Sequence, residues 1–132
     1  MRDVLEMTVT NQGDVIAAAG SAANSHLAIL HSDSGQIESV SWIAGPVRYP
    51  ALSADGRRLA FSRRESGSWH LFVRDFAQGF ARASSADSER QLTTGTCNAT
   101  YPAWENSRSL LYITDCGRSL GLGAAARVPV TP

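Results

Sequence analysis

Segment 49–75 constrains the fold more than any other part of the chain. It begins with an apolar run, and Asp55-Gly56 separates this run from a second one. Asp-Gly predicts a hairpin turn because Gly tolerates positive φ and the Asp carboxylate accepts bonds from backbone N–H groups. Leu59 and Phe61 then alternate with small residues, which is the period of a β-strand. With Trp69–Asp75 after a polar turn, the segment predicts three short strands and two tight turns.

Weaker copies of this segment lie on both sides of it. Gly13 precedes Gly56 by 43 positions, and segment 26–32 precedes 69–75 by the same offset, which also matches Ile16 with Leu59. On the other side, 101–104 repeats 49–52, and 110–112 matches 59–61. A repeat of about 40 to 45 residues is typical of four-stranded propeller blades. The sequence therefore predicts an all-β chain built from repeated antiparallel sheets.

The repeat resembles a known family. Its Pro, Ser, Asp-Gly, Arg, Leu-Ala and aromatic positions are similar to the repeat of the TolB-type (WD40-like) β-propellers, found also in propeller domains of the prolyl oligopeptidase family. The chain departs from that pattern at Leu52, where an aromatic is usual, and at Ala54, where Pro is usual. The expected repeat residues are Tyr49, Pro50, Ser53, Asp55, Gly56, Arg57, Leu59, Phe61, Tyr101, Pro102, Trp104 and Tyr112.

The resemblance implies a single partial β-propeller domain over 1–132, with about three blades near 4–43, 46–95 and 98–130. The first blade is expected to have strands near 5–9, 15–19, 27–31 and 38–42. The last blade is expected to lack its outer strand, because Pro129 and Pro132 cannot donate to a ladder. The resemblance also implies a bacterial, extracytoplasmic (periplasmic) setting.

Composition excludes several classes of partner. The 132 residues carry 12 acidic and 12 basic side chains, so we expect no electrostatic footprint for nucleic acid. No apolar run approaches the roughly 20 residues of a membrane span. The N-terminus does not resemble a secretory signal, which indicates a start inside a larger gene or a fragment.

Three patterns invite a chemical interpretation, and each lacks the context that its chemistry needs. Segment 121–126 matches the G-x-G-x-x-A dinucleotide fingerprint, but no strand or acidic residue follows at the required distance. His26, His31 and His70 fall at different repeat positions, without a cluster of other metal ligands. Ser53 and Asp55 have turn roles, so they do not indicate a Ser-His-Asp triad. We therefore expect no enzyme and no catalytic, cofactor-binding or metal-binding residues.

The two cysteines flank the third hairpin. Cys97 and Cys116 lie ten and nine positions from Ser107, the expected centre of the turn. They should face each other within the Cα separation of about 4.4–6.8 Å that a disulfide needs. The oxidising compartment implied by the resemblance favours this disulfide. Two buried free thiols are the alternative.

Three further segments are candidate surface features. The insertion 78–88 is expected to be a solvent loop that adds little to stability, or else a binding loop carrying Phe80 and Arg82. The pairs Arg57-Arg58 and Arg63-Arg64 are interpreted as solvated hairpin tips, with contact to an anion or a partner as the alternative. Loop 95–98 leads into an innermost strand and is where a ligand would be sought.

These observations predict a non-enzymatic module for protein–protein interaction or scaffolding. The alternative is a fragment of the propeller domain of a prolyl oligopeptidase-family serine peptidase without its catalytic domain. Closed propellers need about four to eight blades. The outer faces of the first and third blades should therefore be apolar and uncovered, open to self-association or to a protein partner.

Overall fold

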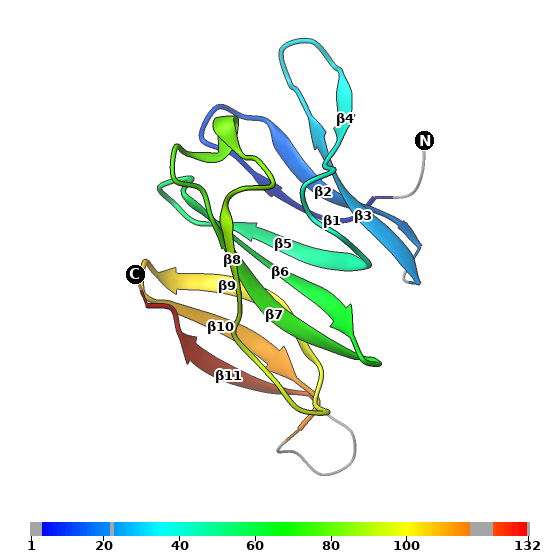
Figure 1. The fold of residues 1–132 in the computed structure, drawn as a ribbon, viewed down its shortest axis with the longest axis vertical. Helices are drawn as coiled ribbons and strands as arrows, with labels where there is room; N and C mark the ends of the chain where they lie inside the picture. The colour runs from blue at the N-terminus through cyan, green and yellow to red at the C-terminus, as the bar shows by residue number, and fades with distance from the viewer. Residues whose placement is uncertain (1–3, 22, 117–122, 132) are drawn as a thin grey trace.

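The protein is all-β and consists of three antiparallel sheets (Figure 1). The computed structural model describes residues 4–21, 23–116 and 123–131. The first sheet contains β1 (Val4–Val9), β2 (Val15–Ser21), β3 (Asn24–Leu30) and β4 (Ile37–Ser39). The second contains β5 (Val47–Leu52), β6 (Arg58–Glu65), β7 (Ser68–Asp75) and β8 (Ser88–Gln91). The third contains β9 (Ala99–Asn106), β10 (Ser109–Thr114) and β11 (Ala124–Pro129).

Each sheet is a meander in which every strand pairs with the next strand along the chain. Within the described ranges the strands do not close into a barrel, and one short 3-10 helix, η1 (Phe80–Arg82), interrupts the β-structure. No described helix has the length and apolar character needed to cross a membrane. Segment Ala17–Ala19, whose alanines favour a helix on propensity alone, is strand because β1 and β3 pair with it on both sides.

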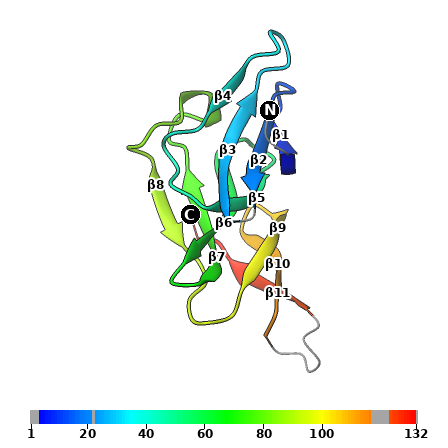
Figure 2. The ribbon, with the colours of Figure 1, turned by 90° about the vertical axis from the view of Figure 1, so that its right-hand side faces the viewer.

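The sheets follow one another along the long axis of the molecule, with the first and third at opposite ends (Figure 1). Their first strands, β1, β5 and β9, are neighbours in this order. In the side view, β4 and β8 lie on the opposite side of the molecule from β1 and β9 (Figure 2). The Glu6 carboxylate accepts the Tyr49 N–H (2.9 Å), and the Trp104 indole N–H donates to the Ala51 carbonyl (2.9 Å). These bonds tie each first strand to the next.

Two apolar cores fill the spaces between the sheets. The core between the first and second sheets contains Ile16, Ala18, Leu27, Ile29, Leu59, Phe61 and Phe72 among its buried residues. The core between the second and third sheets contains Ala60, Val73, Leu110 and Val130, with Trp104 packed against it. The second sheet is therefore covered on both faces, and the central residues 59–62 of β6 and 70–74 of β7 are buried.

The turn between β1 and β2 is one residue shorter than its counterpart in the second sheet. Thr10 N–H donates to the Asp14 carbonyl and Ser53 N–H to the Arg58 carbonyl, each at 2.8 Å. The offset between the sheets is therefore 43 before the turn and 44 after it. The prediction that a single offset of 43 continues beyond Gly13 is wrong.

Because side chains alternate along a strand, this one-residue difference exchanges the two faces of β2 and β3. Ile16 and Ala18 face the second sheet, and Ala17 faces outward. Ala17, not Ala18, therefore occupies the position of Phe61. The same correction makes His26 equivalent to His70, although the sequence placed them at different positions. The equivalent pairs are Val15 and Leu59, Ala17 and Phe61, Ala28 and Phe72, Leu30 and Arg74, and His26 and His70.

The insertion before β8 is folded onto the protein and is not a loop over solvent. The Phe80 ring packs edge-on against Phe76 (centroids 5.4 Å apart) and Trp42 (6.1 Å). Arg74 donates to the Ser84 carbonyl at 2.8 Å, and the Asp87 carboxylate accepts the Ser84 N–H at 2.8 Å. Phe80 therefore belongs to the first core, contrary to the sequence-based expectation. Trp42 was expected in the fourth strand, but β4 ends at Ser39 and Trp42 packs under the insertion.

Candidate interaction surfaces

The outer face of the first sheet is apolar and uncovered by any other described sheet. It encloses an open hollow of about 390 Å³, here called the first-sheet hollow. Its lining is Val4, Met7, Val15, Ala17, Ala19, His26, Ala28, Leu30, Ile37 and Ser39. Met7 is 58% exposed, Ile37 57% and Leu30 39%. Large apolar side chains gathered on one open face of a sheet mark a surface that binds another surface.

At two positions the first-sheet hollow is more apolar than the equivalent face of the second sheet, which is buried. Leu30 and Ile37 pair across β3 and β4, as Arg74 and Glu89 pair across β7 and β8. The second sheet thus carries charges at these positions inside the protein, and the first sheet carries aliphatic side chains on its surface. This reversal of the usual distribution is the strongest sign that the hollow has an occupant.

The outer face of the third sheet is the second uncovered apolar surface. Leu111 is 36% exposed and Ile113 42%, and both project from β10 between the small residues Ala103 and Ala125. Arg127 lies across from Leu111 in β11 and makes a double hydrogen bond to the Glu105 carboxylate (2.7 and 2.6 Å). Arg127 and then Ser109 hold the pKa of Glu105 below its usual value. Tyr112 is half-buried on the other face of β10.

A pair of tyrosines marks the junction of the second and third sheets. Tyr49 and Tyr101 occupy the same position in β5 and β9, with ring centroids 4.2 Å apart. Both have left-handed backbones (φ 58° and 54°) at interruptions of strand pairing, and the following residues, Pro50 and Pro102, are buried. Non-glycine residues in this conformation carry strain that recurs at binding sites. Tyr49 is also covered by Arg48, 4.7 Å from its ring, and burial raises its pKa.

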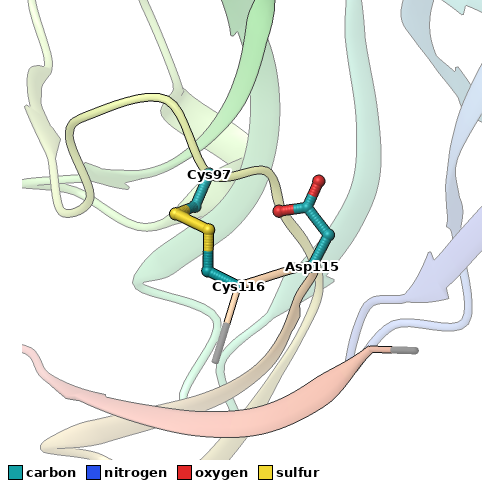
Figure 3. A group of neighbouring side chains, drawn as sticks. All are labelled: Cys97, Asp115 and Cys116. Carbon is teal, nitrogen blue, oxygen red and sulfur yellow. A yellow bond between two sulfur atoms is a disulfide. The ribbon is translucent and has the colours of Figure 1, made fainter. Parts of the chain in front are cut away.

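The cysteines form a disulfide at the end of the third sheet (Figure 3), with Cα atoms 5.7 Å apart. Asp115 lies beside it and accepts two bonds from Asn98, at 2.8 and 2.7 Å. These bonds lower the pKa of Asp115. The three side chains are close enough for a metal site. However, the sulfurs are bonded to each other, and metal binding requires thiolates. This group therefore fastens loop 95–98 to the end of β10.

The carboxylate of Glu89 lies between two arginines, inside the protein. Arg63 Nη1 and Arg74 Nη1 approach its oxygens at 2.5 and 2.7 Å, and Arg74 stacks over Trp42 at 5.1 Å. Burial opposes ionisation, but the two arginines outweigh it and hold the pKa of Glu89 low. Arg58 pairs with Asp75 at 2.9 Å. Arg58 and Arg63 are therefore structural and not solvated tips, whereas Arg57 and Arg64 are exposed.

The Ser53-Asp55 pair holds the turn together. Ser53 Oγ donates to Asp55 Oδ1 at 2.7 Å and accepts the Arg58 N–H at 3.0 Å, and Arg57 N–H donates to the same Asp55 oxygen at 3.0 Å. These bonds lower the pKa of Asp55. Gly56 has φ 71°, which a side chain would disfavour. The turn bonds thus occupy the groups that a triad would have to use.

The histidines and the 121–126 pattern complete the set of sequence patterns that invited a chemical interpretation. His31 lies between Glu38 (3.0 Å) and Asp14 (3.6 Å), and its pKa is raised, mainly by the bond to Glu38. His70 bonds to the Thr93 hydroxyl at 3.2 Å. In the 121–126 pattern, Gly121 and Leu122 lie outside the described residues, and β11, not a helix, begins at Ala124.

The uncovered faces could be foreseen from the number of repeats, but their composition could not, because the one-residue difference in the first turn decides which side chains face outward.

A scan against protein-family models and a search of curated proteins find no match to this chain.

Proposed function

We propose that the three sheets are blades of an incomplete β-propeller and that the protein is a non-enzymatic protein-interaction module. Its binding surfaces are the first-sheet hollow and the outer face of the third sheet. The observation that carries this proposal is the uncovered apolar lining of the hollow, in which Leu30 and Ile37 stand where the second sheet has Arg74 and Glu89. The neighbouring positions of β1, β5 and β9 support a radial arrangement of blades.

A binding surface of this kind gains free energy by removing apolar area from water, about 25 cal/mol per Å². The seven large aliphatic side chains exposed on the two faces that we assign to this role are Val4, Met7, Val9, Leu30, Ile37, Leu111 and Ile113. Two separate apolar faces at opposite ends of the molecule fit a protein that binds between two partners, or one that associates with further copies of itself.

The proposal is tested with 8-anilinonaphthalene-1-sulfonate, a dye that binds exposed apolar surface. The folded full-length chain, diluted until it sediments as a monomer, should bind the dye. Met7→Glu combined with Ile37→Glu should remove at least about half of the fluorescence, because dye binding would strip water from the two carboxylates and bring them close to the dye's sulfonate anion. Ala54→Glu adds the same kind of charge on an exposed turn and serves as the control. A folded monomer without dye binding, or equal binding by all variants, would contradict the proposal.

A further inference from the structure

We propose that the occupant of both uncovered faces is a second copy of this chain. The outer face of the third sheet of each copy packs into the first-sheet hollow of the other, so that two copies close one ring of six sheets. This inference rests on the proposed function and names its partner.

The sheets pack against one another in a single manner. We call the face that a sheet turns toward the next sheet along the chain its trailing face, and the opposite face its leading face. The trailing face of the first sheet, with Ile16 and Ile29, packs against the leading face of the second, with Leu59 and Phe61. The second and third sheets repeat this arrangement, with Ala60 and Val73 facing Leu110. The described part of the chain leaves one leading face and one trailing face uncovered. They are the two kinds that pack together elsewhere in the protein.

The two uncovered faces also differ from their buried equivalents in side-chain size, one having smaller and the other larger residues. On the leading faces, the first sheet has Ala17 and Ala28 where the second has the stacked rings of Phe61 and Phe72. This exchange of large residues for small ones creates the hollow.

On the trailing faces the exchange runs the other way. The third sheet has Leu111 and Ile113 where the second has Ala60 and Ser62, both completely buried. Side chains that project from one uncovered face therefore match a hollow in the other. A well-packed interface requires this matching of volume, since interiors are close-packed.

Charge favours the same pairing. Among the described residues, those that line the first-sheet hollow include no carboxylate or guanidinium. The third-sheet face carries an ion pair beside Leu111, in which Glu105 and Arg127 satisfy each other through two bonds. A charged pair with good geometry can be covered at much lower cost than a single charge. As far as the described residues extend, the contact therefore buries no unpaired charge.

The interface joins two different surfaces, so each copy uses both of them. Such head-to-tail contacts close when the rotation between copies completes a circle. Two copies supply six sheets, within the range of about four to eight blades that closed propellers have. Closure covers all four open faces and leaves none for a third copy.

Sedimentation of the full-length chain tests this inference. At about 20 µM we expect a mass twice the 14.1 kDa of one chain. The hollow variant Ala17→Phe/Ala28→Phe places in the first sheet the aromatic residues that the second sheet carries, so it should fold and sediment as a monomer. The face variant Ile113→Asp should weaken association by about 100-fold or more, because it buries an unpaired charge.

Mixing the two variants distinguishes the contact from a symmetric one. Each mixed pair retains one intact interface, between the hollow of the face variant and the third sheet of the hollow variant. We therefore expect partial recovery of the dimer in the mixture. If either variant alone stays fully dimeric, two like faces are paired and the inference is wrong.

Cross-linking gives a second measurement that does not depend on the stability of these variants. Ala17→Cys and Leu111→Cys, oxidised together, should give a covalent dimer that neither gives alone. Covalent dimer from one variant alone, or none from the mixture, overturns the inference. A wild-type monomer that still binds the dye at 20 µM also overturns it but leaves the proposed function standing, whereas a folded monomer without dye binding contradicts both.

Discussion

Removal of the Phe80 ring tests the conclusion that the insertion is part of the core. A fully buried Phe→Ala change costs about 3–5 kcal/mol. Phe80 is half-buried and contacts Trp42 and Phe76 edge-on, at centroid distances of 6.1 and 5.4 Å. Half of the fully buried cost gives about 2 kcal/mol for Phe80→Ala. A loop that only crosses solvent would instead change the free energy of unfolding by less than about 1 kcal/mol.

The assay is urea unfolding followed by circular dichroism, with the wild type and variant at one protein concentration, because association adds to apparent stability. The matched control is Arg82→Ala, an exposed position in the same helical turn. Its free energy of unfolding should stay within about 0.5 kcal/mol of the wild type. A similarly small effect of Phe80→Ala would show that the insertion contributes no core residue.

Three other measurements test the polar and covalent contacts. Replacing both Cys97 and Cys116 by Ser should cost about 3 kcal/mol, because the disulfide closes a loop with a sequence separation of 19; finding two reactive thiols in the unfolded, unreduced protein would refute the disulfide. The pKa of Glu89 is lower in the folded protein than its unfolded value of 4.5, so ionised Glu89 stabilises the fold above pH 4.5, and this stabilisation is lost as the pH falls through the folded pKa. Glu89→Gln should therefore reduce the dependence of the free energy of unfolding on pH below about pH 4.5. An unchanged pH dependence would contradict this. In an NMR titration, Glu38→Gln should lower the pKa of His31, and no change would show that their 3.0 Å contact does not persist in solution.

Local chemistry made several features predictable from the sequence. Asp55-Gly56 marked its turn, because a left-handed glycine and a carboxylate near free N–H groups favour few other structures. The repeated Tyr-Pro-Ala segments indicated equivalent strands, and the structure places Tyr49 and Tyr101 at equivalent positions. The positions of the cysteines around one hairpin anticipated their proximity. In each case the interacting groups lie within one turn or one repeat.

The charged residues were harder to predict, because their surroundings come from distant parts of the chain. From the sequence, Arg63 was expected just after a strand, at a solvated tip, whereas it lies within β6. In the structure it reaches Glu89, 26 positions away, over the ring of Phe72. Phe80 likewise depends on Trp42, which belongs to the connection after the first sheet. No local pattern specifies such contacts.

Repeated antiparallel strands could be read from the amino-acid sequence, because turn chemistry and alternation act over a few residues. Tertiary structure alone decided which face of each strand is buried. A single missing residue in the Thr10–Asp14 turn reverses the faces of β2 and β3, and segment Val15–Ala19 fits either choice because it is apolar at every position. Packing against the second sheet selects Ile16 and Ala18 for the core and leaves Ala17 in the hollow. The physical reason is the two-residue period of a strand, which makes the choice of face depend on contacts between sheets that lie some 40 residues apart.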